Sequence, residues 1–369
     1  MATVPFDRAG RSPRRTATVF TALACTALTL LATSCARGED EAGGGQTAGG
    51  GQARAQELDD AAGSDQTCNI EQFGMEKFDL KDMTVGFSQS EAESNPFRIT
   101  ETASIKSEAE KRGVELITAN AQSDFAQQIS DVQGLMSQGA ELLIVAPLNS
   151  DGWEPVLAEA ERKQIPIVTI DREINGNPCE DYVTFIGSDF VEQGRRAADR
   201  MIEALGGEGE VAILLGTAGN NVTTERTEGF KERIEEKAPG IEVVFEQTGE
   251  FTREGGQSVT EQLIQSNPEI DGVYAENDEM GIGAVTALRG AGKQPGDVKI
   301  VTVDGTEAAV QGIIDGWIYA VIESNPRFGP LAFDAHESFG KGEDVPVELI
   351  ISDREYTRDN AEEELSNAY

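Results

Sequence analysis

Polar side chains that suit a hydroxyl-rich ligand follow one short apolar run after another along this 369-residue chain. Carboxylate, amide and guanidinium groups can each make two hydrogen bonds in one plane, so they hold neighbouring hydroxyls well. The residues in question are Gln89, Glu93, Phe97 and Arg98, then Asp171 and Arg172, then Arg226, Asn277 and Asp304, and finally Glu323, Ser324 and Asn325. The rings of Phe97 and Phe251 could stack on the apolar face of a sugar. This pattern predicts a sugar-binding site.

Helix caps and turns offer another explanation for any one of these positions, because Asp and Asn favour both. Asp124 and Asp189 are best explained as caps, and Asp124 with Gln127 has the spacing of a capping box. A shared ligand explains six strand ends in succession better than six separate caps do.

The apolar runs alternate with helical patterns, as they do in α/β folds whose parallel sheets are covered by helices on both faces. The predicted strands are residues 84–87, 114–118, 142–146, 165–170, 183–186, 211–215, 241–245, 273–275 and 299–303. About ten strands exceed one comfortable sheet, which favours two Rossmann-like lobes. Ligands of such sheets bind outside the carboxyl ends of the strands, where the polar residues would meet.

Acidic residues outnumber basic ones by 66 to 30, which gives a net charge of −36. Nucleic acid would repel such a chain, because affinity for nucleic acid comes largely from Lys and Arg on phosphates. We therefore expect no nucleic-acid partner and interpret the charge as a solvated acidic surface.

The first 34 residues are typical of a secretory signal peptide, with four arginines between positions 8 and 15 and then an apolar stretch. Residues 31–35, Leu-Ala-Thr-Ser-Cys, resemble the bacterial lipobox, although alanine stands where leucine is usual. We expect lipidation at Cys35; Cys25 is a weaker candidate, and cleavage without lipidation is the alternative. Residues 35–66, rich in Gly and acidic residues, predict a flexible tether.

Two cysteines follow the tether, Cys68 and Cys179. An even pair in an exported protein favours a disulfide, and two free thiols are the alternative. A zinc site is not expected, because the chain has one histidine, His336, and no paired cysteine spacing. We expect no metal and no cofactor.

Several short strings resemble the ribose-binding cluster of the type I periplasmic binding proteins. They are Asp171-Arg172-Glu173, Thr224-Glu225-Arg226, Gly249-Glu250-Phe251-Thr252-Arg253, Glu276-Asn277-Asp278-Glu279-Met280 and Asp304-Gly305. Gly86-Phe87-Ser88-Gln89 and the string at 152–157 are more similar to the galactofuranose-binding branch. Each string is weak alone, but their order and spacing from residue 83 to residue 369 are specific.

The resemblance implies two lobes joined by three hinge crossings, with a sugar in the cleft between them. It places residues 67–188 and 325–350 in an N-terminal lobe, and residues 189–324 and 351–369 in a C-terminal lobe. By matching position, the sugar contacts in the N-terminal lobe are Phe97, Arg98, Asp171 and Arg172. Gln89 and Glu93 are expected as further polar contacts on the loop before Phe97 and Arg98. The matching contacts in the C-terminal lobe are Arg226, Phe251, Asn277 and Asp304. Asn325 matches a hinge contact, and the local alignment leaves Ser324 or Glu323 open there.

The resemblance also implies a function: a monomeric substrate-binding lipoprotein that binds a neutral monosaccharide and delivers it to the permease of an ABC transporter. Such a protein would be exported and held at the outer face of the cell membrane by its lipid anchor alone, or lie in the periplasm. It would not be an enzyme, and the sequence contains no nucleophile elbow or metal motif. A sugar-sensing receptor coupled to a sensor kinase is the alternative, whereas a sugar-responsive repressor would need a basic helix-turn-helix in place of the acidic tether.

Overall fold

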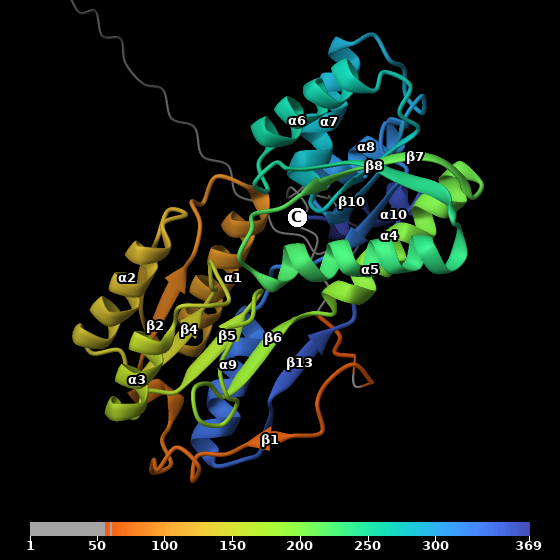
Figure 1. Cartoon of the computed structure of the whole chain (residues 1–369). Coiled ribbons are helices and arrows are strands. Elements are labelled where there is room, and N and C mark those ends of the chain that lie inside the picture. Colours follow the sequence, from red (N-terminus) through yellow and green to blue (C-terminus); the bar gives the residue numbers. More distant parts are fainter. Residues whose placement is uncertain (1–55, 60) are drawn as a thin grey trace, which may run out of the picture. The chain divides into compact units, whose positions relative to one another are not determined.

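The computed structural model describes residues 56–59 and 61–369, and these build two six-stranded sheets with helices on both faces (Figure 1). The predicted α/β fold with two parallel-stranded lobes is confirmed. None of the helices in these two ranges is long and apolar enough to span a membrane. The predicted signal peptide and Cys35 lie outside the described residues.

The sheet of the N-terminal lobe has the order β13-β6-β5-β4-β2-β3, and all its strand pairs are parallel. Its strands are β2 (Thr84–Gln89), β3 (Glu115–Asn120), β4 (Leu142–Val145), β5 (Ile167–Ile170), β6 (Thr184–Ser188) and β13 (Glu348–Ile351). Its helices are α1 (Pro96–Arg112), α2 (Phe125–Ser137), α3 (Glu154–Lys163) and α9 (Gly329–Lys341). A short antiparallel pair, β1 (Thr67–Cys68) with β12 (Val345–Pro346), lies beside this sheet.

The sheet of the C-terminal lobe has the order β14-β11-β10-β9-β7-β8, and β14 is its one antiparallel strand. Its strands are β7 (Glu208–Leu215), β8 (Gly240–Thr248), β9 (Gly272–Ala275), β10 (Lys299–Asp304), β11 (Ala320–Glu323) and β14 (Glu355–Tyr356). Its helices are α4 (Phe190–Leu205), α5 (Asn221–Lys237), α6 (Arg253–Ser266), α7 (Asp278–Gly290), α8 (Glu307–Ile314) and α10 (Ala361–Glu364). Single-turn 3₁₀ helices cover Leu80–Asp82 and Leu365–Asn367.

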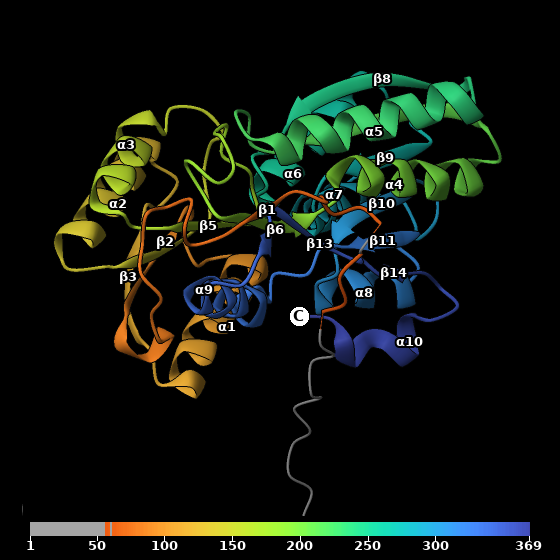
Figure 2. The same cartoon turned by 90° about the horizontal axis from the view of Figure 1, so that it is seen from below.

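Both faces of each sheet are apolar because successive side chains of a strand point to opposite sides. In β4, Leu142 and Ile144 join the core under α1 and α9, while Leu143 and Val145 join the core under α2 and α3. Figure 2 shows α1 and α9 side by side against the sheet. The near-continuous apolar runs of the sequence are therefore strands covered on both faces, as predicted.

Local signals set where the helices begin and end. The Asp124 carboxylate accepts a hydrogen bond from the Gln127 backbone N–H, so Asp124 is the N-cap of α2. The reciprocal half of the predicted capping box does not form, since the Gln127 side chain donates to Asp131, one turn further along the helix. Gly113 ends α1 in the left-handed conformation, with φ of 70°.

The chain passes between the two sheets three times. The passages are Ser188 to Phe190, Glu323 to Gly329 and Ile351 to Glu355. Any change in the angle between the lobes must be absorbed at these three crossings.

The last part of the predicted tether, which covers residues 35–66, is bound to the N-terminal lobe. Leu58 forms an antiparallel bridge with Ile351, and the Ser352 N–H donates to the Glu57 carbonyl at 2.8 Å. Strand β13 is the edge of its sheet, so its unpaired backbone groups bind this segment. The rest of the predicted tether, up to residue 55, lies outside the described residues.

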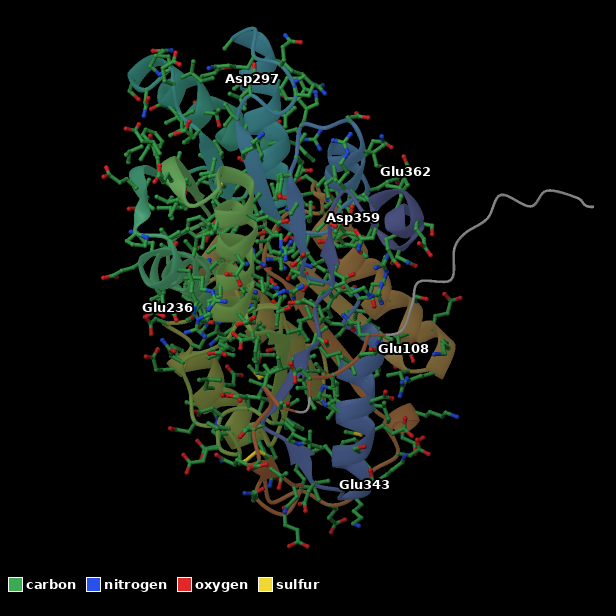
Figure 3. The ribbon with its side chains drawn as sticks, turned by 90° about the vertical axis from the view of Figure 1, so that its right-hand side faces the viewer. Glu108, Glu236, Asp297, Glu343, Asp359 and Glu362 are labelled. Atoms are coloured by element: carbon green, nitrogen blue, oxygen red, sulfur yellow. A yellow bond between two sulfur atoms is a disulfide. The ribbon has the colours of Figure 1, made fainter. Side chains whose placement is uncertain are left out.

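Many acidic side chains of the described residues are exposed to solvent. Glu236, Asp297, Glu343 and Glu362 are all exposed (Figure 3). Such a surface favours solubility and makes no demand for a cationic partner.

The predicted disulfide is confirmed: Cys68 of β1 is bonded to Cys179, in the loop between β5 and β6. Both cysteines are buried in the core of the N-terminal lobe, together with Val345 of β12. The bond therefore joins two parts of a single lobe, 111 residues apart in the chain.

Replacing both Cys68 and Cys179 by serine is expected to lower the free energy of unfolding by about 2–5 kcal/mol, because the unfolded chain regains the freedom of a long closed loop. Urea unfolding measures the change. Reductant should destabilise the wild-type protein by a similar amount and leave the double variant unaffected. A wild-type protein whose unfolding midpoint ignores reductant would contradict this expectation.

Candidate functional site

A small pocket lies between the carboxyl ends of the two sheets and has an empty volume of about 330 Å³. Its walls come from both lobes. The N-terminal lobe supplies Glu91, Asn95, Phe97, Arg98, Asp171 and Arg172, and the C-terminal lobe supplies Val222, Arg226, Phe251, Asn277 and Asp304. A parallel α/β sheet places its ligands at this edge, so the location follows from the topology.

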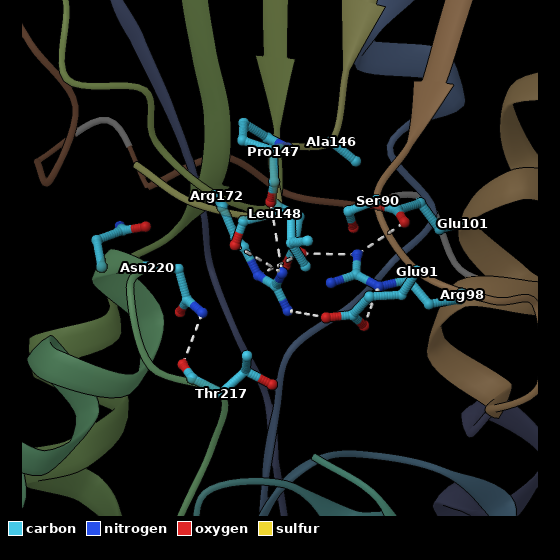
Figure 4. A network of polar contacts seen from close by, with 12 residues as sticks. Ser90, Glu91, Arg98, Glu101, Ala146, Pro147, Leu148, Arg172, Thr217 and Asn220 are labelled. Carbon is cyan, nitrogen blue, oxygen red and sulfur yellow. Dashed lines mark hydrogen bonds and ion pairs between the residues drawn. The ribbon is translucent and has the colours of Figure 1, made fainter. Parts of the chain in front are cut away.

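Arg98 is the centre of the ionic network in the N-terminal lobe (Figure 4). Its guanidinium lies 3.0 Å from Glu91, 2.8 Å from Glu101 and 2.7 Å from Asp171. Arg172 lies 2.7 Å from the other oxygen of Glu91. The two arginines are 2–3 % exposed, so each depends on these carboxylates for compensation.

The two glutamates of this network respond to it in opposite ways. Burial alone would raise the pKa of Glu91, but the Arg172 and Arg98 guanidiniums outweigh it and lower the pKa to about 2. Burial raises the pKa of Glu101 to about 7 in spite of Arg98, because Asp171 adds a second negative charge nearby. Glu91 is therefore a fixed anion of the pocket wall.

Arg226 is the cation of the C-terminal lobe. Its Nε donates to the Gln193 side-chain carbonyl at 2.8 Å, and its Nη1 donates to the Glu276 carbonyl at 2.6 Å. Its Nη2 lies 4.0 Å from Asp304. Burial raises the pKa of Asp304, and the neighbouring Asp278 raises it further. Arg226 is thus held by the protein on one side and faces the pocket beside Asp304 on the other.

Three pocket residues hold a backbone conformation that L-residues rarely adopt. Asp171 has φ of 66°, Phe251 has φ of 56° and Asp304 has φ of 139°. Each such residue costs about 1–3 kcal/mol and persists only where its surroundings enforce it. Their gathering around one cavity indicates that side-chain direction there is set by function rather than by stability.

Two aromatic rings border the pocket from opposite lobes. Phe97 packs with Phe328 and Tyr369 at centroid distances of 6.4 and 6.2 Å. The ring of Phe251 lies 5.7 Å from the Arg172 guanidinium of the other lobe. A side chain on Gly216 would overlap the Phe251 ring, so glycine is required there.

The structure brings eight of the eleven predicted sugar contacts together around the pocket. They are Phe97, Arg98, Asp171, Arg172, Arg226, Phe251, Asn277 and Asp304. Asn277 is also a helix cap, because its Oδ1 accepts from the Met280 N–H at 3.0 Å while its Nδ2 donates to the Phe251 carbonyl. Asp189 is a cap only, as predicted.

The other three predicted contacts do not line the pocket. Gln89 is the last residue of β2, and its side chain turns toward α1, where it donates to Glu101 at 2.8 Å and Thr102 at 3.1 Å. Glu93 is exposed to solvent on the loop before α1. Asn325 turns its side-chain oxygen back to the Arg327 N–H within its own crossing.

The two alternatives to Asn325 are engaged within the hinge as well. Both carboxylate oxygens of Glu323 accept hydrogen bonds, from the Tyr356 hydroxyl and from the Arg354 N–H. Ser324 accepts from the Tyr369 hydroxyl through its carbonyl. None of the three lines the pocket.

Glu91, Asn95 and Val222 also line the pocket and were not among the predicted sugar contacts. Charge balance is the signal that could have found Glu91. Arg172 is buried and lies 3.7 Å from Asp171, so a further carboxylate was needed close to Arg172, and Glu91 supplies it at 2.7 Å. Helix capping is the signal for Asn95. Its side chain accepts a hydrogen bond from the Arg98 N–H, so Asn95 is the N-cap of α1.

The chain is similar to known proteins over most of its length. Residues 85–335 match the family model of the periplasmic binding protein domain. The galactofuranose-binding protein of Escherichia coli (strain K12) is 37% identical over 289 residues, which cover 77% of this chain and 90% of that protein.

Two solved structures are similar over the same region. One is the binding protein of the arabinose ABC transporter of Shewanella sp. ANA-3, bound to α- and β-L-arabinofuranose. It is 36% identical with a TM-score of 0.73, over 76% of this chain and 94% of that one. The other, from Mycobacterium smegmatis in complex with β-D-fucofuranose, is 39% identical with a TM-score of 0.74, over 77% and 94%.

Buried carboxyls predict an unusual pH dependence of stability. Burial raises the pKa of Glu101 and of Glu276 to about 7, and that of Asp278 to about 6, from ordinary values near 4. A carboxyl with a raised folded pKa stabilises the native state fully below its unfolded pKa and loses that contribution as the pH rises through the folded pKa. Glu91, with its lowered pKa, loses its contribution only as the pH falls below about 4.

The melting temperature of the ligand-free protein should therefore rise when the pH is lowered from about 8 to about 5. Calorimetry in about 1 M salt measures this with surface charges screened. Glu276→Gln should reduce the difference, because its amide does not titrate. A protein more stable at the higher pH would refute the assignment of these buried carboxyls.

Proposed function

This chain belongs to the periplasmic binding protein family, and we propose that it binds a neutral monosaccharide between its lobes and delivers it unchanged to the permease of an ABC transporter. The observation that carries the proposal is the pocket itself, which combines cations, anions and two aromatic rings from both lobes. Hydroxyls both donate and accept hydrogen bonds, so a sugar can satisfy guanidiniums and carboxylates alike.

The charges of the pocket support a neutral ligand. Three guanidiniums line it, those of Arg98, Arg172 and Arg226, and the carboxyl groups of Glu91, Asp171 and Asp304 line it beside them. Glu101 adds a fourth carboxyl group, 2.8 Å from Arg98 but outside the lining. A ligand with its own charge would leave one of these groups buried without compensation, which is costly. A polyol adds hydrogen bonds without disturbing the balance.

The two aromatic rings of the pocket and the ligands of its relatives support a furanose. Similar proteins are named for galactofuranose or were solved with arabinofuranose and fucofuranose. We propose a five-membered sugar ring lying between Phe97 and Phe251.

The division of the site between the lobes supports a binding protein that closes on its ligand. Asp171 and Arg172 belong to one lobe, while Arg226 and Asp304 belong to the other. A sugar that contacts all four favours the arrangement that brings the lobes together, because it binds that arrangement more tightly than an open one. A monomer contains the complete site, and the permease would recognise the closed form.

A neutral aldose that can form a furanose ring should stabilise the protein by roughly 2.7 kcal/mol when it is present at ~100 times its dissociation constant. L-Arabinose and D-galactose are the first ligands to test, by thermal shift and by calorimetric titration. The phosphate ester or uronic acid of the same sugar should give no shift, for the charge reason above.

Asp171→Ala should abolish the shift, because it leaves Arg98 facing the pocket without one partner. Asp359→Ala, an exposed aspartate of the C-terminal lobe, is the matched control and should bind as the wild type does. If no neutral sugar stabilises the wild-type protein, or if Asp171→Ala binds normally, the proposed site is wrong.

Export and lipid anchoring are part of the proposal, although they rest on residues outside the described range. The family supports an exported protein, and the lipobox-like residues 31–35 support attachment through Cys35 at the outer face of the cell membrane.

Cys35→Ser should move the protein from the membrane fraction to the soluble exported fraction, because no acyl chain can then be attached. Cys25→Ser is the matched control and should remain with the membrane. Detergent partition of both variants measures this. Membrane association that survives Cys35→Ser would exclude this anchor.

A further inference from the structure

A buried glutamine connects the pocket to the hinge. Gln193 lies in the first turns of α4, directly after the first crossing, and is 1 % exposed. Its side-chain carbonyl accepts the hydrogen bond of Arg226 Nε at 2.8 Å. Its side-chain nitrogen donates in the opposite direction, to the Asp353 carboxylate at 2.6 Å and to the Glu323 carbonyl at 3.2 Å.

The partners of this glutamine belong to two crossings of the hinge, and one of these partners also binds the third crossing. Glu323 begins the second crossing and Asp353 lies in the third. Ser188, at the start of the first, donates its hydroxyl to the other oxygen of Asp353 at 3.1 Å. One amide group and one carboxylate therefore bring the three crossings together.

The packing of α4 on α5 fixes the distance between Gln193 and Arg226. Side chains on Gly194 of α4 or Gly229 of α5 would overlap the backbone of the opposite helix, at Arg226 and Val191 respectively. The two helices thus meet at backbone contact, and the glutamine cannot withdraw from the arginine without parting them.

We propose that Gln193 is a positioning residue that couples the occupied pocket to the hinge: it orients the Arg226 guanidinium toward the ligand and holds the three crossings in one arrangement. The inference rests on the proposed function, since it takes Arg226 as a ligand contact. The Gln193 amide can orient Arg226 only if both its oxygen and its nitrogen are hydrogen-bonded. Without a partner for the nitrogen, the amide could flip and turn its donor nitrogen toward the Arg226 guanidinium, which can only donate.

Gln193→Ala should weaken the binding of L-arabinose or D-galactose, whichever binds the wild-type protein, about tenfold to a hundredfold, the effect of losing a hydrogen bond to a charged group. Amide hydrogen exchange of the ligand-free variant should be faster in the three crossings and unchanged in the strands of both sheets. Small-angle scattering should show a smaller compaction on adding sugar. Gln262→Ala, an exposed glutamine of α6, is the control and should match the wild type in all three measurements.

A polarity swap separates positioning from simple packing. Gln193→Glu keeps the acceptor for Arg226 but sets a carboxylate against Asp353, so binding should fall as in the alanine variant. Adding Asp353→Asn restores a donor opposite the new acceptor and should recover most of the affinity. A residue needed only to fill space would show no such recovery, because both substitutions conserve volume.

The outcomes distinguish this inference from the proposed function. If no sugar binds the wild-type protein, the proposed function fails, while the exchange measurement on ligand-free protein still decides whether Gln193 holds the crossings. If sugar binds and Gln193→Ala retains wild-type affinity and exchange, the coupling role is wrong and the sugar site stands. Failure of the swap to recover affinity also overturns it.

Discussion

Covering both faces of each parallel sheet restricts where this protein can hold polar groups. Val85 and Phe87 of β2 and the alternating apolar residues of β4 fill the cores on either side, so little of either sheet face remains for a ligand. Only the carboxyl ends of the strands can present polar side chains to a ligand. Because the two sheets face each other at these ends, each lobe supplies part of one site and neither lobe contains all of it. The buried ion pairs, the strained backbone and the hinge network all follow from placing a polar site at this edge.

That restriction also explains which residues a sequence can reveal. Asp171 and Arg172 directly follow an apolar run, so the end of the run marks them as site residues. Gln89 does not line the pocket, because β2 continues to Gln89 and the alternation of the strand turns its side chain toward α1. Glu91, two residues later, reaches the pocket because the strand has ended, a difference that hydrophobicity alone does not show.

Long-range partners were beyond prediction for a different reason. Gln193 is a polar residue on the buried, otherwise apolar face of α4, and its role appears only once Arg226, Glu323 and Asp353 are brought beside it. Strand β14 has two residues, too few for a periodic signal, yet together with β13 it bounds the third crossing. The pairing of Leu58 with Ile351 likewise depends on which strand lies at the edge of the sheet, and the sequence does not show this.

The disulfide has a consequence for how the chain can change over evolutionary time. Cys68 and Cys179 are fastened inside one lobe, at the opposite end of its sheet from the crossings, so the covalent bond adds stability without restraining rotation between the lobes. The strained φ angles of Asp171, Phe251 and Asp304 reduce stability at the pocket. The residues that stabilise the chain are therefore separate from those that determine which ligand it binds. Substitutions in the pocket that lower stability, and that allow new sugars to bind, can be tolerated before the protein unfolds.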